Sequence, residues 1–268
     1  MREALIDTFR EGFGPGFTAI TREGERGIDT GIDFSICVQA DGKSLHEWSV
    51  KESVWVLLDG VAEVRFAGQV HRIARRSLFD EGPTVLHLGP ETWAEIVPAN
   101  GRVEWAVLRA TCGIRFEPRL FRPEDVEPEY RGRGLAQGAC LRIVRTVFDH
   151  QTRADSGLVL GEVVNYPGRW SSFPPHGHAQ PELYHYRFTL PQGYGHAELG
   201  DEVFKVRAYD TLKIVDSRTH AQVAAPGYGM WYLWAVRHLR DSPYTGFTTE
   251  PGHAWMLDPR SQGWEPRG

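Results

Sequence analysis

The feature that most limits how this chain can fold is a two-residue alternation of apolar and polar side chains. A period of two places successive side chains on opposite faces of a β-strand. Turn residues such as Asp59-Gly60 and Ala67-Gly68 separate the alternating segments, and one or two helical turns are expected only over residues 2–10. Many short strands spaced about 8–12 residues apart predict an all-β sandwich or barrel. The alternating segments are residues 31–40, 52–60, 61–73, 102–110, 140–149, 157–165, 182–190, 202–210, 211–217, 219–225 and 229–236.

These segments form two series, one in each half of the chain, that share the same two-residue alternation. Residues 116–134, rich in proline and charge, lie between the two series, and such a composition is typical of a connector. A chain of 268 residues is long enough for two modest domains. We therefore expect two barrels of one architecture, over residues 1–125 and 126–268.

Charge and cysteine content narrow the class of protein. The net charge is −5 and no basic block collects on one segment, which argues against a nucleic-acid partner. The opening stretch MREALIDTFREGFGPG has scattered charges and no apolar run, so neither a signal peptide nor a membrane anchor is expected. Three widely spaced cysteines are expected to be free thiols in a reducing cytoplasm.

Candidate metal ligands gather on one stretch of the second half. On an extended strand residues i and i+2 face the same way, so His176 and His178 can reach one point. Glu182 shares their parity, and His220 follows after an alternating run. A lone histidine pair is a weak signal in a chain with 11 histidines, but HxHx3E followed by a further histidine is stronger. Three imidazoles and one carboxylate suit one divalent ion, with zinc as first choice and manganese, iron, cobalt or nickel as alternatives.

This spacing resembles the first motif of the cupin superfamily, with His220 where the second motif has its histidine. The flanking runs NYPGRWSSFPPHGH, ELYHYRF and HAQVAAPGYGMWYLWAV resemble the 5-deoxy-glucuronate isomerase family of inositol catabolism. The similarity covers nearly the whole chain and is sharpest over residues 158–236. It implies a bicupin, two double-stranded β-helix or jelly-roll barrels. It also implies an aldose–ketose isomerisation of 5-deoxy-D-glucuronate to 5-dehydro-2-deoxy-D-gluconate, in which the metal polarises the carbonyl.

The first half lacks a comparable ligand set. His46 and Glu52 are present, but Trp48 stands where a second imidazole would be needed, and His87 and Glu91 show no clear ligand spacing. We expect this barrel to buttress the second one or to build an oligomer.

The sequence departs from the family pattern near the metal motif. Only Ala179–Pro181 separate His178 from Glu182, where the family has a longer insert. The turn before His220 lacks the glycine and aromatic residue of the family, and Trp234 replaces a polar residue. The metal site should tolerate these changes, whereas substrate preference should shift.

Three residues are candidates for catalysis. Tyr184 and Tyr186 share the parity of Glu182 and should face the barrel interior, as catalytic groups or as packing aromatics. Glu162 lies in an apolar run, where a carboxylate must be paired, liganded or neutral. Glu162 is either the general base or a surface glutamate on an edge strand. A tyrosine or a metal-bound hydroxide could fill the role of base instead.

Substrate contacts are expected from aromatic and basic side chains. Arg187 has the parity opposite to Glu182, which also allows a solvated or interface position, and Arg207 and Arg237 are alternatives to Lys213 for binding a substrate carboxylate. The residues predicted to bind substrate are Trp170, Arg187, Lys213, Tyr232 and Trp234.

Other functions remain compatible with the same motif. A cupin dioxygenase uses a similar ligand set, and a sugar-binding cupin would bind without turnover. An isomerase of a related uronate, as in the 5-keto-4-deoxyuronate isomerase group, is a third alternative. The expected partner is a small sugar acid, not a membrane or nucleic acid, and a homo-oligomer is left open.

Overall fold

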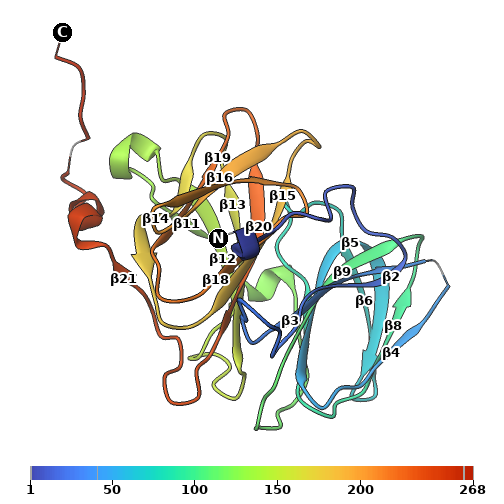
Figure 1. The fold of residues 1–268 in the computed structure, drawn as a ribbon. Helices are drawn as coiled ribbons and strands as arrows, with labels where there is room; N and C mark the ends of the chain where they lie inside the picture. The colour runs from blue at the N-terminus through green and yellow to red at the C-terminus, as the bar shows by residue number, and fades with distance from the viewer. Residues whose placement is uncertain (1, 41, 262, 268) are drawn as a thin grey trace.

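Two β-barrels lie side by side in this computed structural model (Figure 1). The structure describes residues 2–40, 42–261 and 263–267. In the described residues the strands pair antiparallel throughout and the helices are short 3-10 turns, so the expected all-β architecture is confirmed. None of the helices in the described residues has the length and apolar character that a membrane crossing requires.

The first barrel is built from one nine-stranded sheet that curls on itself. A short 3-10 helix, η2 (Pro123–Asp125), follows it. Its strands are β2 (Gly16–Thr21), β3 (Asp33–Gln39), β4 (Leu45–Glu47), β5 (Glu52–Phe66), β6 (Gln69–Arg75), β7 (Val85–Leu88), β8 (Ala94–Pro98), β9 (Val103–Ala110) and β10 (Arg119–Phe121).

Strand β5 continues without a break past Asp59-Gly60, where the sequence predicted a turn between two strands. Gly60 has a φ of 108°, and the register with β9 shifts between Leu57 and Asp59. The strand therefore bends and exchanges β9 for β6 and β8 as its neighbours. A Cβ at Gly60 would lie 2.6 Å from the carbonyl oxygen of Arg102, so the dipeptide marks a bend that only glycine fits.

The second barrel consists of two facing sheets that enclose a core of tyrosines and aliphatic residues. The seven-stranded sheet has the order β1 (Leu5–Ile6), β18 (Thr211–Ile214), β15 (Glu182–Phe188), β20 (Met230–Arg237), β13 (Leu158–Asn165), β12 (Arg142–Phe148) and β11 (Glu129–Arg131). The five-stranded sheet has the order β17 (Glu202–Arg207), β16 (Tyr194–Leu199), β19 (His220–Ala224), β14 (Trp170–Gly177) and β21 (Thr248–Thr249). The 3-10 helices η3 (Leu135–Gly138) and η4 (Pro251–Leu257) flank it.

The N-terminal segment belongs to the second barrel. The helix expected over residues 2–10 is limited to the 3-10 turn η1 (Arg2–Ala4), and β1 then pairs with β18. Arg10 holds this segment in place by a bidentate ion pair with Asp210, at 2.8 and 2.7 Å. Strand β1 therefore lies in a sheet of the second barrel, although it comes from the start of the chain.

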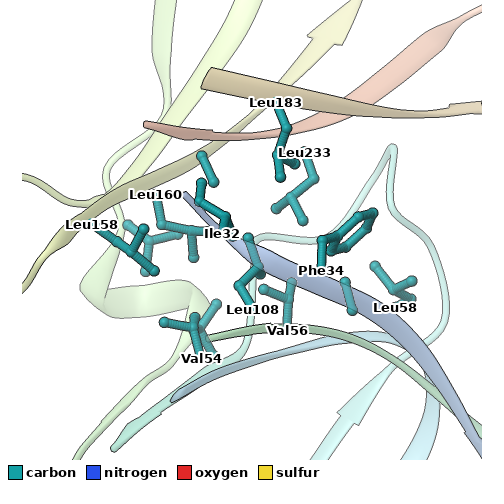
Figure 2. Packing of buried hydrophobic residues seen from close by; sticks show 14 of the residues in the cluster. Ile32, Phe34, Val54, Val56, Leu58, Leu108, Leu158, Leu160, Leu183 and Leu233 are labelled. Atoms are coloured by element: carbon teal, nitrogen blue, oxygen red, sulfur yellow. The ribbon is translucent and has the colours of Figure 1, made fainter. Parts of the chain in front are cut away.

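A shared apolar core joins the two barrels. Leu158, Leu160, Leu183 and Leu233 from the outer face of the seven-stranded sheet meet residues of the first barrel (Figure 2). The facing residues of the first barrel are Ile32, Phe34, Val54, Val56, Leu58 and Leu108. The central strands of this sheet are consequently buried on both faces, one against the other barrel and one against the interior of their own.

Candidate functional site

Three of the predicted metal ligands lie together inside the second barrel. His178 follows the end of β14, Glu182 opens β15 and His220 opens β19. Each can offer one ligand atom such that all three atoms lie within 4.8 Å of one another. Glu182 Oε2 is 3.1 Å from His178 Nε2 and 3.4 Å from His220 Nε2.

Backbone carbonyls set the tautomer of all three histidines of the motif. Nδ1 lies 3.3 Å from Pro174 O in His176, 2.9 Å from Gln180 O in His178 and 3.3 Å from Arg218 O in His220. A carbonyl oxygen can only accept, so each Nδ1 must carry the proton. Nε2 is therefore the nitrogen left to bind a metal, an arrangement that is typical of metal-binding histidines.

The donor set fits a divalent ion. Ligand atoms that sit about 2.1 Å from a tetrahedral cation are about 3.4 Å from one another. The two distances from Glu182 Oε2, 3.1 and 3.4 Å, agree with that spacing. His220 Nε2 is buried and has no hydrogen-bond partner among the described residues. A buried nitrogen without a partner is costly unless a ligand occupies its lone pair.

His176 stands beside this group without being one of the three. Its ring centroid is 4.7 Å from that of His220, with which it pairs across β14 and β19, and 4.0 Å from the stacked ring of Phe247. Burial lowers the pKa of His176 to about 4, so its imidazole is neutral at pH 7.

Burial controls the charges of the group. It lowers the pKa of His220 well below its ordinary value, so this imidazole is neutral. Burial also lowers the pKa of His178, but the hydrogen bond and charge of Glu182 outweigh it and the net shift is upward. Burial raises the pKa of Glu182 despite His178. His178 and Glu182 are thus joined by a hydrogen bond between two atoms that could each also serve as a metal ligand.

A cavity of about 260 Å³ opens beside the ligand group. Val159, Val163 and Trp234 give it an apolar wall, and Ser172, Tyr184 and Tyr232 supply hydroxyls. The full lining is Arg131, Arg142, Val144, Thr146, Asp149, His150, Gln151, Val159, Val163, Ser172, His176, His178, Glu182, Tyr184, Tyr232, Trp234, Tyr244, Thr245, Gly246 and Phe247. A concave site with an apolar wall and a few converging polar groups is typical of small-molecule binding.

The hydroxyls form one connected group. Ser172 Oγ is 3.3 Å from the Tyr184 hydroxyl and 3.4 Å from the Tyr232 hydroxyl, and Tyr232 donates to Ser171 Oγ at 2.8 Å. Ser172 has a φ of 50°, and β14 loses register with β19 between Ser171 and His176. Burial raises the pKa of Tyr184 well above its ordinary value and that of Tyr232 to about 12.

Two other predicted residues from the ligand stretch do not line the cavity. Tyr186 is fully buried in the barrel core, as its parity indicated, but its hydroxyl donates to Gln222 Oε1 at 2.7 Å. Trp170 packs against Phe173, with ring centroids 5.3 Å apart. Tyr184, Tyr232 and Trp234 are the predicted aromatic residues that do line it.

The structure corrects the interpretation of Glu162. Its carboxylate accepts from Arg75 Nη2 at 2.7 Å and from Arg145 Nη1 at 2.8 Å, and it does not line the cavity. Glu162 has the parity of Leu158 and Leu160, so it points at the first barrel. It is neither a surface glutamate on an edge strand, because β13 lies between β12 and β20, nor placed to act as a general base.

Arg187 and Lys213 also face the first barrel, so their expected contact with substrate is corrected. Arg187 Nη2 donates to Glu104 Oε1 at 2.7 Å, and Lys213 Nζ donates to the carbonyl of Ile28 at 2.8 Å. The interface position allowed for Arg187 by its parity is the one observed. Neither residue lines the cavity.

Several lining residues were missed from the sequence. In the sequence Arg142 is an ordinary polar residue of an alternating strand. It shares parity with Val144, which places both side chains on the same face of that strand. Tyr244 and Phe247 come from the irregular tail, where no period marks an inward face. Tyr244 packs edge-on against His178, with ring centroids 4.8 Å apart.

Comparison with known families gives one match over nearly the whole chain. The model described as the KduI/IolB family matches residues 11–256. A 5-deoxy-glucuronate isomerase of Geobacillus kaustophilus is 28% identical over 249 residues, which cover 85% of this chain and 86% of the relative. One from Halalkalibacterium halodurans is 25% identical over 201 residues, covering 69% and 71%.

Solved structures agree on the fold. An IolB-like protein from Salmonella typhimurium LT2 superposes with a TM-score of 0.79 at 26% identity, covering 92% of this chain and 97% of that one. A Lactobacillus farciminis oxalate decarboxylase, solved as a formate complex, superposes with a TM-score of 0.64 at 10% identity, covering 88% and 85%. The second likeness shows the two-barrel cupin fold alone.

Proposed function

Because this chain belongs to the KduI/IolB family, we propose that its second barrel isomerises 5-deoxy-D-glucuronate to 5-dehydro-2-deoxy-D-gluconate. Membership confirms the resemblance expected from the sequence, and relatives named 5-deoxy-glucuronate isomerase cover most of the chain. The chain is thus an isomerase of this family, acting on a small sugar acid.

The observation that carries the proposal is the set of anchored imidazoles beside a cavity rich in hydroxyls. We propose that His178, Glu182 and His220 hold one divalent ion and that His176 is the fourth ligand, with zinc as the first choice of metal. When bound, such an ion acts as a Lewis acid toward a carbonyl oxygen. The three Nδ1–H groups bonded to carbonyls keep the Nε2 lone pairs oriented without rearrangement.

The cavity hydroxyls would bind and orient the sugar. Tyr184 and Tyr232 remain protonated at neutral pH because burial raises the pKa of both phenols. Neither phenol therefore acts as a base. Tyr184 would donate to the sugar, whereas Tyr232 donates to Ser171 Oγ and leaves its oxygen to accept from a sugar hydroxyl. A donor aimed at the oxygen on which negative charge grows, as the proton moves from C2 to C1, lowers the barrier to that transfer. Trp234 and the valines would cover the C–H faces of the sugar and exclude water.

A solvent-exchange assay tests the proposal. Metal-loaded protein is mixed with 5-deoxy-D-glucuronate in D₂O, and proton NMR follows the aldehyde signal and deuterium incorporation. Conversion to the ketose is expected, with no oxygen uptake and no reaction after chelation. Oxygen consumption would instead favour a cupin dioxygenase, and tight binding without conversion would favour a sugar-binding protein.

The same assay compares 5-deoxy-D-glucuronate with 5-keto-4-deoxyuronate as substrates. A faster conversion of 5-keto-4-deoxyuronate than of 5-deoxy-D-glucuronate would keep the reaction type and move the substrate assignment within the family. The exposed His196 on β16 provides a matched control, because His196→Ala changes an imidazole that does not line the cavity.

A further inference from the structure

The geometry points to Arg142 as the receptor for the carboxylate of the sugar acid. This inference rests on the proposed function and extends it, since it assigns a site to the acid group that distinguishes a uronate from a neutral sugar. Arg142 lies on β12, lines the cavity and is half-buried.

Strand register separates Arg142 from the ligand group along the sheet. Glu182 pairs with Val236 at one end of β20. Arg142 pairs with Asn165, whose partner on β20 is Met230 at the other end. Both groups nevertheless line the same cavity, so a sugar acid bound there, with its carbonyl carbon and its carboxylate at opposite ends, would meet matching chemistry at each end.

Arg142 is the cation in the cavity that lacks an acidic partner. Within the described part of the chain no carboxylate forms an ion pair with it, whereas Arg131 on the next strand pairs with Glu129 at 3.0 Å. Asp149 also lines the cavity, but its Oδ1 accepts from the backbone amides of its own turn. Glu182 is paired with His178.

The guanidinium is held in place while most of its donors stay free. Nη1 donates to the carbonyl of Cys140 at 2.9 Å, the one hydrogen bond that the Arg142 side chain makes to the described residues. Gly132, with a φ of 78°, makes room for this contact, because a Cβ there would lie 3.1 Å from Nη1. An arginine has five N–H donors in a planar fork that matches a carboxylate in a bidentate fashion.

The Arg142 guanidinium is half-buried without a counter-ion among the described residues, and this favours binding of an anion. Burial lowers the pKa of Arg142, the result expected for a charge removed from water without compensation. A bound carboxylate would compensate that charge, whereas a neutral hydroxyl would do so only in part. Arg187 and Lys213 have carboxylate partners in Glu104 and Glu25, and Arg237 donates to two backbone carbonyls.

The test compares an acid with its amide in wild-type protein and in Arg142→Gln, Arg142→Lys and Arg133→Gln. Calorimetric titration of the metal-loaded proteins with D-glucuronate and D-glucuronamide gives equilibrium preference, and initial rates on 5-deoxy-D-glucuronate give KM and kcat. Arg133→Gln is the matched control, because Arg133 is exposed in the neighbouring loop and does not line the cavity.

Wild type and Arg133→Gln should prefer the acid to the amide. Arg142→Gln should weaken acid binding and raise KM by about 10–100-fold, the usual worth of hydrogen bonds to a charged group, with a smaller change in kcat. The preference for the acid should vanish in Arg142→Gln and return in part in Arg142→Lys. Unchanged metal content and melting temperature verify the fold, and if Arg142→Gln fails to fold, the preference in Arg142→Lys decides.

Two results overturn the inference. One is a wild-type protein that does not prefer the acid, and the other is an acid preference that survives in Arg142→Gln. Failure of the proposed function looks different, because wild type would then bind D-glucuronate in an Arg142-dependent way without isomerising any uronate.

Discussion

At the scale of single residues, the candidate metal centre depends on which nitrogen of each imidazole carries the proton. His178 and His220 each place Nδ1 at a backbone carbonyl two residues away in sequence, and both Nε2 atoms approach Glu182 Oε2. The local backbone therefore fixes the orientation of both candidate ligands. The surrounding barrel, not the ion, supplies the apolar core.

Replacing His220 by alanine should remove metal binding and activity while leaving the fold intact. His220 offers a candidate ligand atom, and cores in both barrels remain after its loss. Elemental analysis should fall from about one metal per chain to near zero. The melting temperature of His220→Ala should stay close to that of chelated wild type and His196→Ala. Cooperative unfolding on chelation of wild type would instead identify a structural metal.

Replacing Trp234 by asparagine should move substrate preference toward 5-deoxy-D-glucuronate. Trp234 lines the cavity, and its indole lies against the backbone of Gly161 on the paired strand, where a Cβ would collide with it. We expect wild type to be less active on 5-deoxy-D-glucuronate than other members of the family. Trp234→Asn should change the ratio of kcat/KM values between two uronates by about 10-fold or more.

The control for this substitution is Trp93→Asn, at a half-exposed indole of the first barrel. A substrate ranking that stays the same in Trp234→Asn would refute the idea. Gly161→Ala offers a second probe, because the added methyl group should push the indole into the cavity and lower activity on every sugar acid.

At the scale of elements, the chain after β20 completes the cavity. Residues 244–247 line it, and β21 then pairs with β14 at His176 and Gly177. In Figure 1 this segment, drawn in red, runs beside β14. An irregular segment thus becomes one wall of the site because two residues of β-pairing fix its course.

Replacing Phe247 by alanine should weaken metal binding by up to about tenfold, the lower end of what loss of an orienting partner costs. The ring of Phe247 is stacked on His176, and its loss would free that imidazole to rotate. Competition with a chromophoric chelator measures the change. Trp264→Ala serves as control, since Trp264 lies in the same tail and is 87% exposed. Equal affinities for metal in Phe247→Ala and wild type would exclude this role.

At the scale of the whole molecule, the two barrels share a core and a buried ion cluster. Arg75 of the first barrel and Arg145 of the second both bind Glu162, and the three side chains are 0%, 7% and 1% exposed. Backbone carbonyls of Leu57, Leu78, Phe79 and Glu81 accept further hydrogen bonds from the Nη atoms of the two arginines. The first barrel therefore fixes the outer face of the sheet whose inner face carries the cavity.

Replacing Glu162 by glutamine should reduce the free energy of unfolding by about 3–5 kcal/mol, because two buried arginines lose their counter-charge. Denaturant unfolding measures the loss, and Glu63→Gln, at an ion pair on the surface, should change little. The folded Glu162→Gln protein should keep its kcat. A large fall in kcat at unchanged stability would restore Glu162 as a general base.

The sequence by itself determined the local and short-range features of this protein. Period-two alternation identified strands because backbone geometry alone creates it. The spacing of His176, His178, Glu182 and His220 indicated a cupin, and the runs that flank these residues indicated the family. Three of those four side chains lie together in the barrel. Their role as metal ligands stays a prediction.

Only the tertiary structure decided which face of each strand looks into the cavity. Alternation separates the two faces of a strand, but both faces of the seven-stranded sheet are buried. The hydrophobicity of the side chains therefore could not tell the face that lines the cavity from the face that packs on the other barrel. Glu162 and Arg187 consequently face the other barrel, while Arg142 and Tyr184 face the site. Phe247 joins His176 from a distant tail, and no local pattern encodes a contact of that kind.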